Sequence, residues 1–229
     1  FVEDAKFLRT LTDQTLKFTL PGPMTIIDTL FDQHYGSREQ LAFAFAEILN
    51  EEAKELVAAG IDIIQFDEPA FNVFFDDVRN WGIAALERAA SGLTSKTAVH
   101  ICYGYGIEAN IKWKNTLGDE WRQYENIFPM LAQSSIDQVS LECQNSRVPM
   151  ELIEILRGKQ IMVGAIDVAS NKVESAQDVA NVLREALKYV DAENLYSCTN
   201  CGMVPLSRDV SNGKLQALAA GTALINKEL

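Results

Sequence analysis

Short apolar runs of five to seven residues alternate along the chain with longer segments in which apolar residues recur every three or four positions. The short runs are typical of buried strands, and the longer segments have the spacing of amphipathic helices. The pattern predicts strands at 16–20, 61–66, 97–102, 137–142, 160–166 and 194–198. It predicts helices at 38–59, near 73–91, near 119–132, at 149–158, at 174–190 and at the C-terminal end.

A strand followed by a helix, repeated along the chain, predicts an α/β fold in which helices cover a parallel sheet. Ser37 precedes the segment at 38–59, and Ser175 precedes the helical residues Ala176 to Val190; both are typical N-cap residues. An open, doubly wound sheet and an incomplete TIM (β/α)8-type barrel both fit this order. Polar residues follow nearly every strand, whereas a doubly wound sheet would concentrate them at one switch point. Their spread favours the barrel.

Composition narrows the class of protein. A chain of 229 residues that is 48% hydrophobic is expected to form a single domain, residues 1–229, with a large core. The formal net charge of −12 argues against nucleic acid as a partner, because phosphate backbones are bound by clustered Lys and Arg. The chain contains no apolar run of membrane-spanning length and no secretory leader, so we expect a cytoplasmic protein without a membrane partner.

Residues that can bind a metal stand at several predicted strand ends. His100 and Cys102 share one face of a strand, because side chains alternate along it. Glu142 ends the fourth strand, and Cys201 follows the sixth. Imidazole nitrogen and thiolate sulfur are ligands that zinc favours, and a catalytic zinc commonly has three or four protein ligands. The pattern therefore predicts a zinc site of His100, Cys102, Glu142 and Cys201.

Other roles for these residues remain open. Cys198 and Cys201 can join His100 and Cys102 in a closed structural zinc site, or they can form a redox pair by themselves. His100 can also be a buried core histidine, and Glu142 a carboxylate that reaches water at its strand end. With only four cysteines in the chain, metal or catalytic roles outrank a disulfide scaffold.

Asp67 follows the second strand, shortly before Pro69. Asp and Pro are common in surface turns, so a turn is the simplest interpretation. The functional interpretation is a carboxylate that binds a substrate ammonium group through a charge-assisted hydrogen bond.

Six segments of the chain, taken in order and with their spacing, resemble the catalytic barrel of cobalamin-independent methionine synthase, above all its short single-barrel members. The segments are PGPMTI (21–26), IDIIQFDEPAF (61–71), HICYG (100–104), SLECQNSR (140–147), VGAIDVAS (163–170) and ENLYSCTNCGM (193–203). The resemblance implies zinc-dependent transfer of a methyl group to the thiol of homocysteine, which forms methionine. By the same resemblance the zinc ligands fall on His100, Cys102, Glu142 and Cys201, and the aspartate that holds the homocysteine amino group falls on Asp67.

Members of this family begin with two further strands. The resemblance of this chain starts just before the third, at FVEDAKF (1–7). We therefore expect a methionine-synthase-like barrel domain over residues 1–229 that lacks the first two βα units.

The residues expected to handle the methyl donor depart from the long folate-using members. Thr29 stands in place of their tryptophan, Val73 in place of a glutamate, and Ala169 in place of the proton-donating histidine. A folate nitrogen is a poor leaving group unless it is protonated, so the donor is expected to be a corrinoid-bound methyl group or a folate used differently. An accessory protein is a further possible partner. Methyl transfer to another small thiol and a non-catalytic zinc-stabilised binding barrel are the alternatives.

Overall fold

The computed structural model describes residues 1–104 and 108–229. The described residues form a six-stranded sheet in the order β1-β2-β3-β4-β5-β6, and the pairs β1–β2, β2–β3 and β5–β6 are parallel. Each strand begins and ends within two residues of its predicted position. The strands are β1 (Lys17–Pro21), β2 (Ile63–Asp67), β3 (Lys96–Ile101), β4 (Gln138–Glu142), β5 (Gln160–Ile166) and β6 (Leu195–Thr199).

The order of the strands distinguishes the two architectures that the sequence left open. Every strand is hydrogen-bonded to the next one along the chain, so the sheet has no switch point at which the order reverses. This is the order of a TIM barrel, and the α/β prediction is confirmed with six strands consistent with part of such a barrel. The chain divides into two compact units, residues 1–101 with 133–139 and residues 102–132 with 140–229. The single domain over residues 1–229 stays a prediction.

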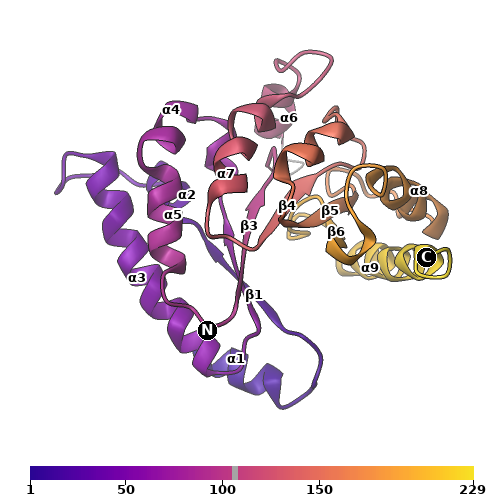
Figure 1. Ribbon diagram of the computed structural model, residues 1–229, viewed down its shortest axis with the longest axis horizontal. Coiled ribbons are helices and arrows are strands. Elements are labelled where there is room, and N and C mark those ends of the chain that lie inside the picture. The colour runs from indigo at the N-terminus through magenta and orange to yellow at the C-terminus, as the bar shows by residue number, and fades with distance from the viewer. Residues whose placement is uncertain (105–107) are drawn as a thin grey trace. The chain divides into compact units, whose positions relative to one another are not determined.

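The first unit contains β1 to β3. Helix α3 packs against α5 and against α2, as Figure 1 shows in its indigo-to-magenta part. Ser37 caps α3, because its side chain accepts a hydrogen bond from the Gln40 N–H. The helices of this unit are α1 (Val2–Arg9), α2 (Pro23–Asp28), α3 (Arg38–Ala58), η1 (Pro69–Asn72), α4 (Phe75–Asp77), η2 (Val78–Gly82, a π-helix) and α5 (Ile83–Ala90).

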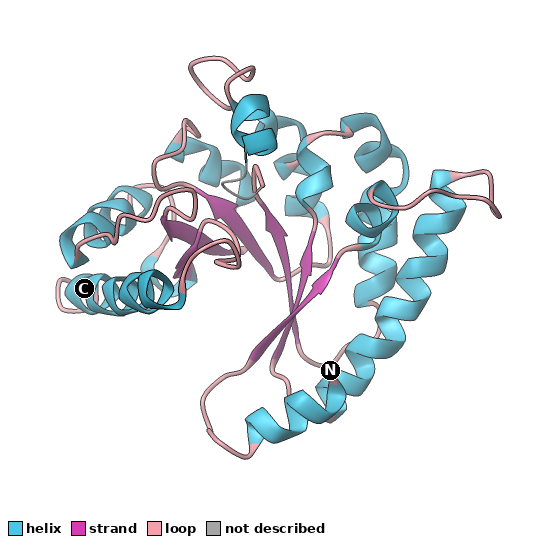
Figure 2. Ribbon diagram, turned by 180° about the vertical axis from the view of Figure 1, so that it is seen from behind, coloured by secondary structure: helices cyan, strands magenta, loops and turns pink. Residues whose placement is uncertain are grey.

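The second unit contains β5 and β6. Helices α8 and α9 lie side by side in both views (Figures 1 and 2). Their approach is close, because a Cβ added at Gly221 would lie 2.5 Å from the Cβ of Val179. The helical segments from residue 108 onward are α6 (Glu108–Lys114), η3 (Gln123–Asn126), α7 (Phe128–Gln133), η4 (Met150–Leu156), α8 (Ala176–Ala186), η5 (Ala192–Asn194) and α9 (Arg208–Ile225).

Several helix predictions were wrong in detail. The helix expected near 119–132 is interrupted, and α7 begins at Phe128 because Pro129 has no N–H and is tolerated only in a first turn. The segment 149–158 forms the 3₁₀ helix η4. The short helices α1, α2 and α6 were not predicted at all, because six to eight residues are too few to establish a helical period.

A buried ion pair joins α9 to the segment before α8. The Lys214 Nζ lies 2.9 Å from Glu174 Oε2, and the exposed fractions of the two side chains are 0% and 6%. Glu174 Oε1 also accepts a hydrogen bond of 2.9 Å from the Asp167 N–H, at the end of β5. The pair therefore anchors the loop between β5 and α8.

We expect Lys214→Met to lower the free energy of unfolding by about 3 to 5 kcal/mol, because it leaves the Glu174 carboxylate buried without its counter-ion. Urea unfolding measures this loss. Lys188→Met is the matched control, since Lys188 pairs with Glu185 in solvent and its loss is expected to change stability little. Equal losses of stability in the two variants would show that the buried Lys214–Glu174 pair contributes no more than an exposed pair.

Candidate metal centre

Two cysteines that are 99 positions apart in the chain meet at the ends of their strands. Cys102 follows β3 directly and Cys201 lies two residues after β6, and their sulfur atoms are 3.4 Å apart. Both are buried, with 1% and 8% of their surface exposed, and they form a small cluster with Val168, against which Met203 packs. None of the four cysteines forms a disulfide. The two thiols are therefore held together by the fold in a site closed to bulk water.

His100 completes a group that can hold a metal. It precedes Cys102 by two residues, and ligand atoms of His100, Cys102 and Cys201 all lie within 4.8 Å of one another. Zn–S bonds of about 2.3 Å in a tetrahedral site place two sulfur ligands about 3.8 Å apart. The observed separation of 3.4 Å between the sulfur atoms is near that value. The donor atoms and their spacing fit a zinc-type ion.

The electrostatics of the two thiols also suit a cation. The hydrogen bond to Cys201 and burial raise the pKa of the Cys102 thiol well above its usual value. Two thiolates side by side in an apolar site repel each other, so without a cation the thiols stay protonated. A divalent metal would replace these protons, because thiolate is the form of cysteine that binds metal.

Glu142 lies at the end of β4 and is 4% exposed. Its Oε1 accepts a hydrogen bond of 2.9 Å from Lys114 Nζ, and its Oε2 accepts one of 3.1 Å from the Tyr103 N–H. Burial raises the pKa of this carboxyl, and the Lys114 ammonium opposes that shift. The alternative in which Glu142 simply reaches water is wrong. Glu142 is not part of the three-residue group within 4.8 Å, so its role as fourth ligand stays a prediction.

Aromatic rings lie beside this ion pair. The ring of Tyr103 lies 5.0 Å from that of Trp121 and 5.2 Å from that of Tyr124, and the Lys114 Nζ lies 5.5 Å from the centre of the Trp121 ring. Sequence reasoning missed Lys114, because α6 is too short to predict and the lysine lies 28 residues from its carboxylate partner. The rings keep water from the pair, which strengthens the attraction between Lys114 and Glu142.

Cys198 occupies a different position from the other thiols. Its sulfur lies 3.6 Å from the hydroxyl of Ser140. Among the described residues the three-residue group does not include it. This placement favours the ligand set with Cys201 over the closed site that uses both cysteines of the CTNC segment.

Asp67 is the last residue of β2, and its partner in the register of β2 and β3 is His100. Its Oδ1 accepts a hydrogen bond of 2.8 Å from the side chain of Gln65, which itself accepts one of 2.7 Å from Lys17. A residue of its own strand therefore orients the Asp67 carboxylate, and Asp67 does not lie in a surface turn. Asp67 is only partly buried. This position leaves part of the carboxylate accessible to a substrate.

Glu68 has a structural role that the sequence did not reveal. It is fully buried, and its carboxylate accepts hydrogen bonds from the N–H groups of Met24 and Thr25 and from the Thr25 hydroxyl, at 2.9, 2.8 and 2.7 Å. Burial raises the pKa of Glu68 to about 7, although these three donors oppose the shift. A Cβ at Gly22 would lie 2.2 Å from the carboxyl carbon. Glu68 thus caps α2 and fixes the corner after β1.

The three positions that the resemblance assigns to the methyl donor carry no ionisable group. The Thr29 hydroxyl donates to the Ile26 carbonyl at 2.8 Å, and the Val73 side chain is exposed. Ala169 lies after β5, where its N–H donates to Asp167 Oδ1 at 2.8 Å. None of these three side chains can act as a general acid at neutral pH.

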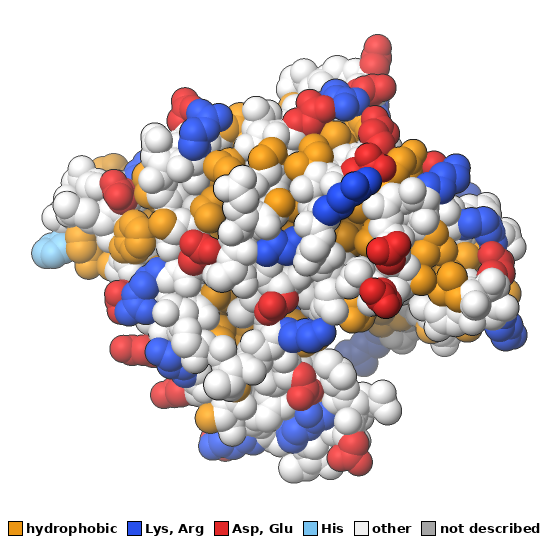
Figure 3. Space-filling model, viewed as in Figure 1, with side chains coloured by type: hydrophobic (Ala, Val, Ile, Leu, Met, Phe, Trp, Pro, Cys, Tyr) orange, Lys and Arg blue, Asp and Glu red, His pale blue; other side chains and the backbone are white. Residues whose placement is uncertain are grey.

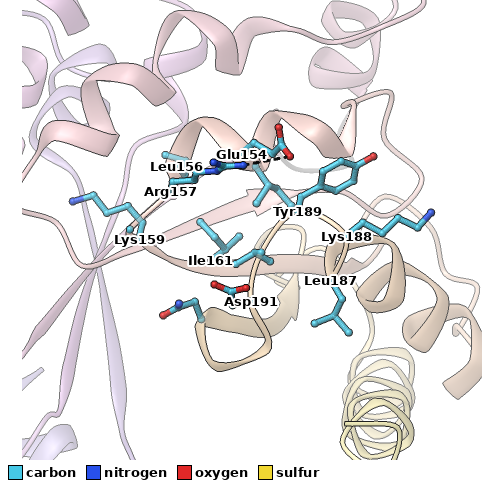
Figure 4. Close-up of a pocket in the computed structure, with 13 residues that line it drawn as sticks. Glu154, Leu156, Arg157, Lys159, Ile161, Leu187, Lys188, Tyr189 and Asp191 are labelled. Carbon is cyan, nitrogen blue, oxygen red and sulfur yellow. Dashed lines mark ion pairs between the residues drawn. The ribbon is translucent and has the colours of Figure 1, made fainter.

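A pocket of about 430 Å³ lies away from these residues. Figure 4 shows it beside Arg157, Lys159, Lys188 and Tyr189. Its lining includes Lys159 and Ile161, on either side of the first residue of β5, and Asn194, just before β6, so it lies at the amino-terminal ends of these strands, opposite the end that carries Cys201. In a barrel fold that end serves stability rather than chemistry.

Charged side chains of both signs are interspersed over the face drawn in Figure 3. Exposed ion pairs such as Arg184–Glu228 also occur among the described residues. Within the described part of the chain, no helix combines the length and the apolar character that a membrane span requires.

The fold and the cluster define a class: an α/β protein with barrel-type strand order and an imidazole–thiol centre suited to a metal at the carboxyl ends of its strands. A family model, the catalytic domain of cobalamin-independent synthase, matches residues 1–222. The chain belongs to this family.

Individual relatives agree with this assignment. The methionine synthase of Saccharolobus solfataricus is 32% identical over 232 residues, which cover 100% of this chain and 64% of that protein. The methionine synthase of Saccharolobus islandicus is 33% identical over 93% of this chain and 59% of its own length. The chain thus spans about three fifths of the length of these curated relatives.

Solved structures show the same fold. A B12-independent methionine synthase from Shewanella sp. W3-18-1, in complex with selenomethionine, is 68% identical with a TM-score of 0.98, over 100% of this chain and 67% of that one. A methyltransferase from Methanosarcina mazei shares the fold at 19% identity, with a TM-score of 0.70 over 98% of this chain and 64% of the other.

Proposed function

We propose that the protein is a zinc-dependent methyltransferase that transfers a methyl group to the thiol of homocysteine and forms methionine. The buried group of His100, Cys102 and Cys201 carries this proposal, because it occurs in a chain of the cobalamin-independent synthase family. The similar Shewanella protein supports it, since selenomethionine is the selenium analogue of the expected product. The proposal includes a cytoplasmic location, a methyl-folate or corrinoid methyl donor, and an accessory protein as a possible partner.

In this proposal His100, Cys102, Glu142 and Cys201 hold the zinc ion. A bound divalent metal lowers the pKa of a coordinated thiol enough to deprotonate it, so it supplies the substrate as a thiolate at neutral pH. Cys102 and Cys201 are buried, so their sulfur atoms would hold the metal away from bulk water. The Lys114 ammonium balances the negative charge of the Glu142 carboxylate in its apolar surroundings. Asp67 binds the ammonium group of homocysteine and thereby orients the thiol.

The proposal is tested by methionine formation from homocysteine, with the full-length protein, added zinc, and methylcobalamin or methyl-folates in parallel. We expect methionine with at least one donor and none after zinc is removed with a chelator. Cysteine and 2-mercaptoethanol serve as competing thiols. Zinc-loaded protein that methylates these thiols as fast as homocysteine would overturn the substrate assignment, and protein that methylates none of the three would favour the non-catalytic barrel.

Asp67→Asn is expected to keep its zinc and to weaken homocysteine binding by about 1.5 to 3 kcal/mol, the scale of one hydrogen bond to a charged group. Metal analysis and calorimetric titration with homocysteine measure the two properties. Asp62→Asn is the matched control, because Asp62 precedes the same strand at its opposite end and is expected to leave homocysteine affinity unchanged. Loss of zinc from Asp67→Asn would place the residue among the metal ligands instead.

A further inference from the structure

One buried amide side chain joins two of the segments that carry candidate metal ligands. Asn200 is 2% exposed. Its Oδ1 accepts hydrogen bonds from the N–H groups of Cys143 and Gln144 at 3.1 and 3.2 Å, and its Nδ2 donates to the Gln144 carbonyl at 2.7 Å. The amide therefore uses three of its four hydrogen-bonding positions on one turn of backbone.

The two segments are distant in sequence, yet each carries a candidate ligand next to the contact. Asn200 directly precedes Cys201, and Cys143 directly follows Glu142. The Cys143 and Gln144 N–H groups lie just beyond the end of β4, where partly buried backbone donors need hydrogen-bond acceptors. The Asn200 side chain supplies such a partner from 56 and 57 residues away.

The end of β5 lies between these segments and leaves room for the amide. The Asn200 N–H donates to the Ile166 carbonyl at 2.9 Å, and the Gln144 N–H donates to the Gly164 carbonyl at 2.8 Å. A Cβ at Gly164 would lie 2.4 Å from Asn200 Oδ1 and 2.7 Å from the Leu141 carbonyl oxygen. Only glycine at position 164 allows Asn200 to reach the turn after β4 without displacement of the backbone.

We propose that Asn200 is a positioning residue for the metal centre: its side chain sets the turn that carries Glu142 at a defined distance from the segment that carries Cys201. This inference rests on the proposed zinc function and adds to it a residue outside the ligand set. Asparagine suits the role because it both donates and accepts. Aspartate of the same shape keeps two acceptor contacts but sets a carboxylate oxygen against the Gln144 carbonyl oxygen, which it repels, and alanine loses all three contacts.

The test measures metal binding rather than turnover. Zinc affinity is determined by competition with a chromophoric chelator, and cobalt(II) in place of zinc gives visible absorption bands that depend on the number and kind of ligands. Asn200→Ala is expected to weaken zinc binding about 10- to 100-fold, as is typical when a group that orients metal ligands is removed. Its cobalt spectrum at saturation is expected to change. Asn200→Asp, which repels the Gln144 carbonyl, is expected to weaken zinc binding as well.

Asn50→Ala is the matched control. Asn50 is equally buried at 2%, and its side chain donates to the Ala89 and Ser91 carbonyls, at 2.9 and 2.7 Å, in the unit that contains β1 to β3. It is expected to lower thermal stability while leaving zinc affinity and the cobalt spectrum unchanged. If Asn50→Ala weakened zinc binding as much as Asn200→Ala does, the effect would be general loosening of the fold and the inference would be wrong.

Failure of this inference is distinguishable from failure of the proposed function. If the wild-type protein binds no zinc, the proposed function fails. If the wild-type protein binds zinc, while folded Asn200→Ala binds it with the same affinity and the same cobalt spectrum, only the positioning role fails. Circular dichroism establishes that the variants are folded, and the aspartate variant provides the answer if the alanine variant is not.

Discussion

Cys102→Ala and Cys201→Ala are each expected to reduce bound zinc from about one ion per chain to almost none after dialysis. The two sulfur atoms lie 3.4 Å apart in a site that is nearly closed to solvent. Without either sulfur atom, the remaining protein ligands are too few to compensate the metal for the water molecules that it loses on binding. Elemental analysis of the purified variants measures the change. His100→Ala and Glu142→Ala are expected to lose zinc as well.

Cys198→Ala and Cys143→Ala are the controls for this experiment. Both thiols lie in the same compact unit as Cys102 and Cys201, and the three-residue metal group includes neither of them. Both variants are expected to retain zinc. The opposite pattern, in which Cys198→Ala loses zinc while Glu142→Ala keeps it, would establish a closed structural site and refute the catalytic one.

Methylcobalamin, or a folate with unusual requirements, is expected to support turnover of the full-length protein better than methyltetrahydropteroyl-triglutamate. A folate nitrogen leaves only when it is protonated, and Ala169 offers no proton at the position where the resemblance implies a histidine. Loss of a general acid typically slows a reaction about 10²- to 10⁴-fold. A corrinoid donor needs no such acid, because its leaving group departs as a reduced cobalt centre. Rates of methionine formation with each donor alone measure the difference.

Substitutions at the three diverged positions sharpen this comparison. Ala169→His is expected to raise turnover with the triglutamate and to leave turnover with methylcobalamin unchanged, since only the folate reaction needs a proton donor. Thr29 and Val73 provide neither an aromatic ring nor a carboxylate for a pterin. Efficient turnover with the triglutamate alone, insensitive to changes at positions 29, 73 and 169, would contradict the donor prediction without affecting the zinc prediction.

The ion pair between Glu142 and Lys114 affects the prediction about zinc binding. The carboxylate is held by an ammonium and a backbone N–H. Removal of one partner of a buried ion pair leaves an uncompensated charge. A Lys114→Met variant therefore belongs in the zinc analysis beside Glu142→Ala, because it separates the loss of the carboxylate from the loss of its counter-ion.

The sequence by itself determined the strands, their α/β class and the kinds of residue at their ends. Strand positions were predictable within two residues, because alternation and buried apolar runs are local properties that each segment carries in its own composition. His100 and Cys102 were predictable as a pair for the same reason, since residues two positions apart in an extended strand share a face. Short or irregular helices were not predictable, because they contain too few turns to show a period.

Only the tertiary structure decided which distant residues meet. The contact between Cys102 and Cys201 spans 99 residues, and it joins the residue after β3 to the segment after β6. The partners of Glu142, the cap that Glu68 forms on α2 and the hydrogen bonds of Asn200 likewise join segments far apart in the chain. Such contacts depend on strand register and on space left by residues such as Gly164, and neither is encoded in a local pattern. The chemistry of the site was therefore readable from residue types, whereas its geometry depended on the packing of the whole sheet.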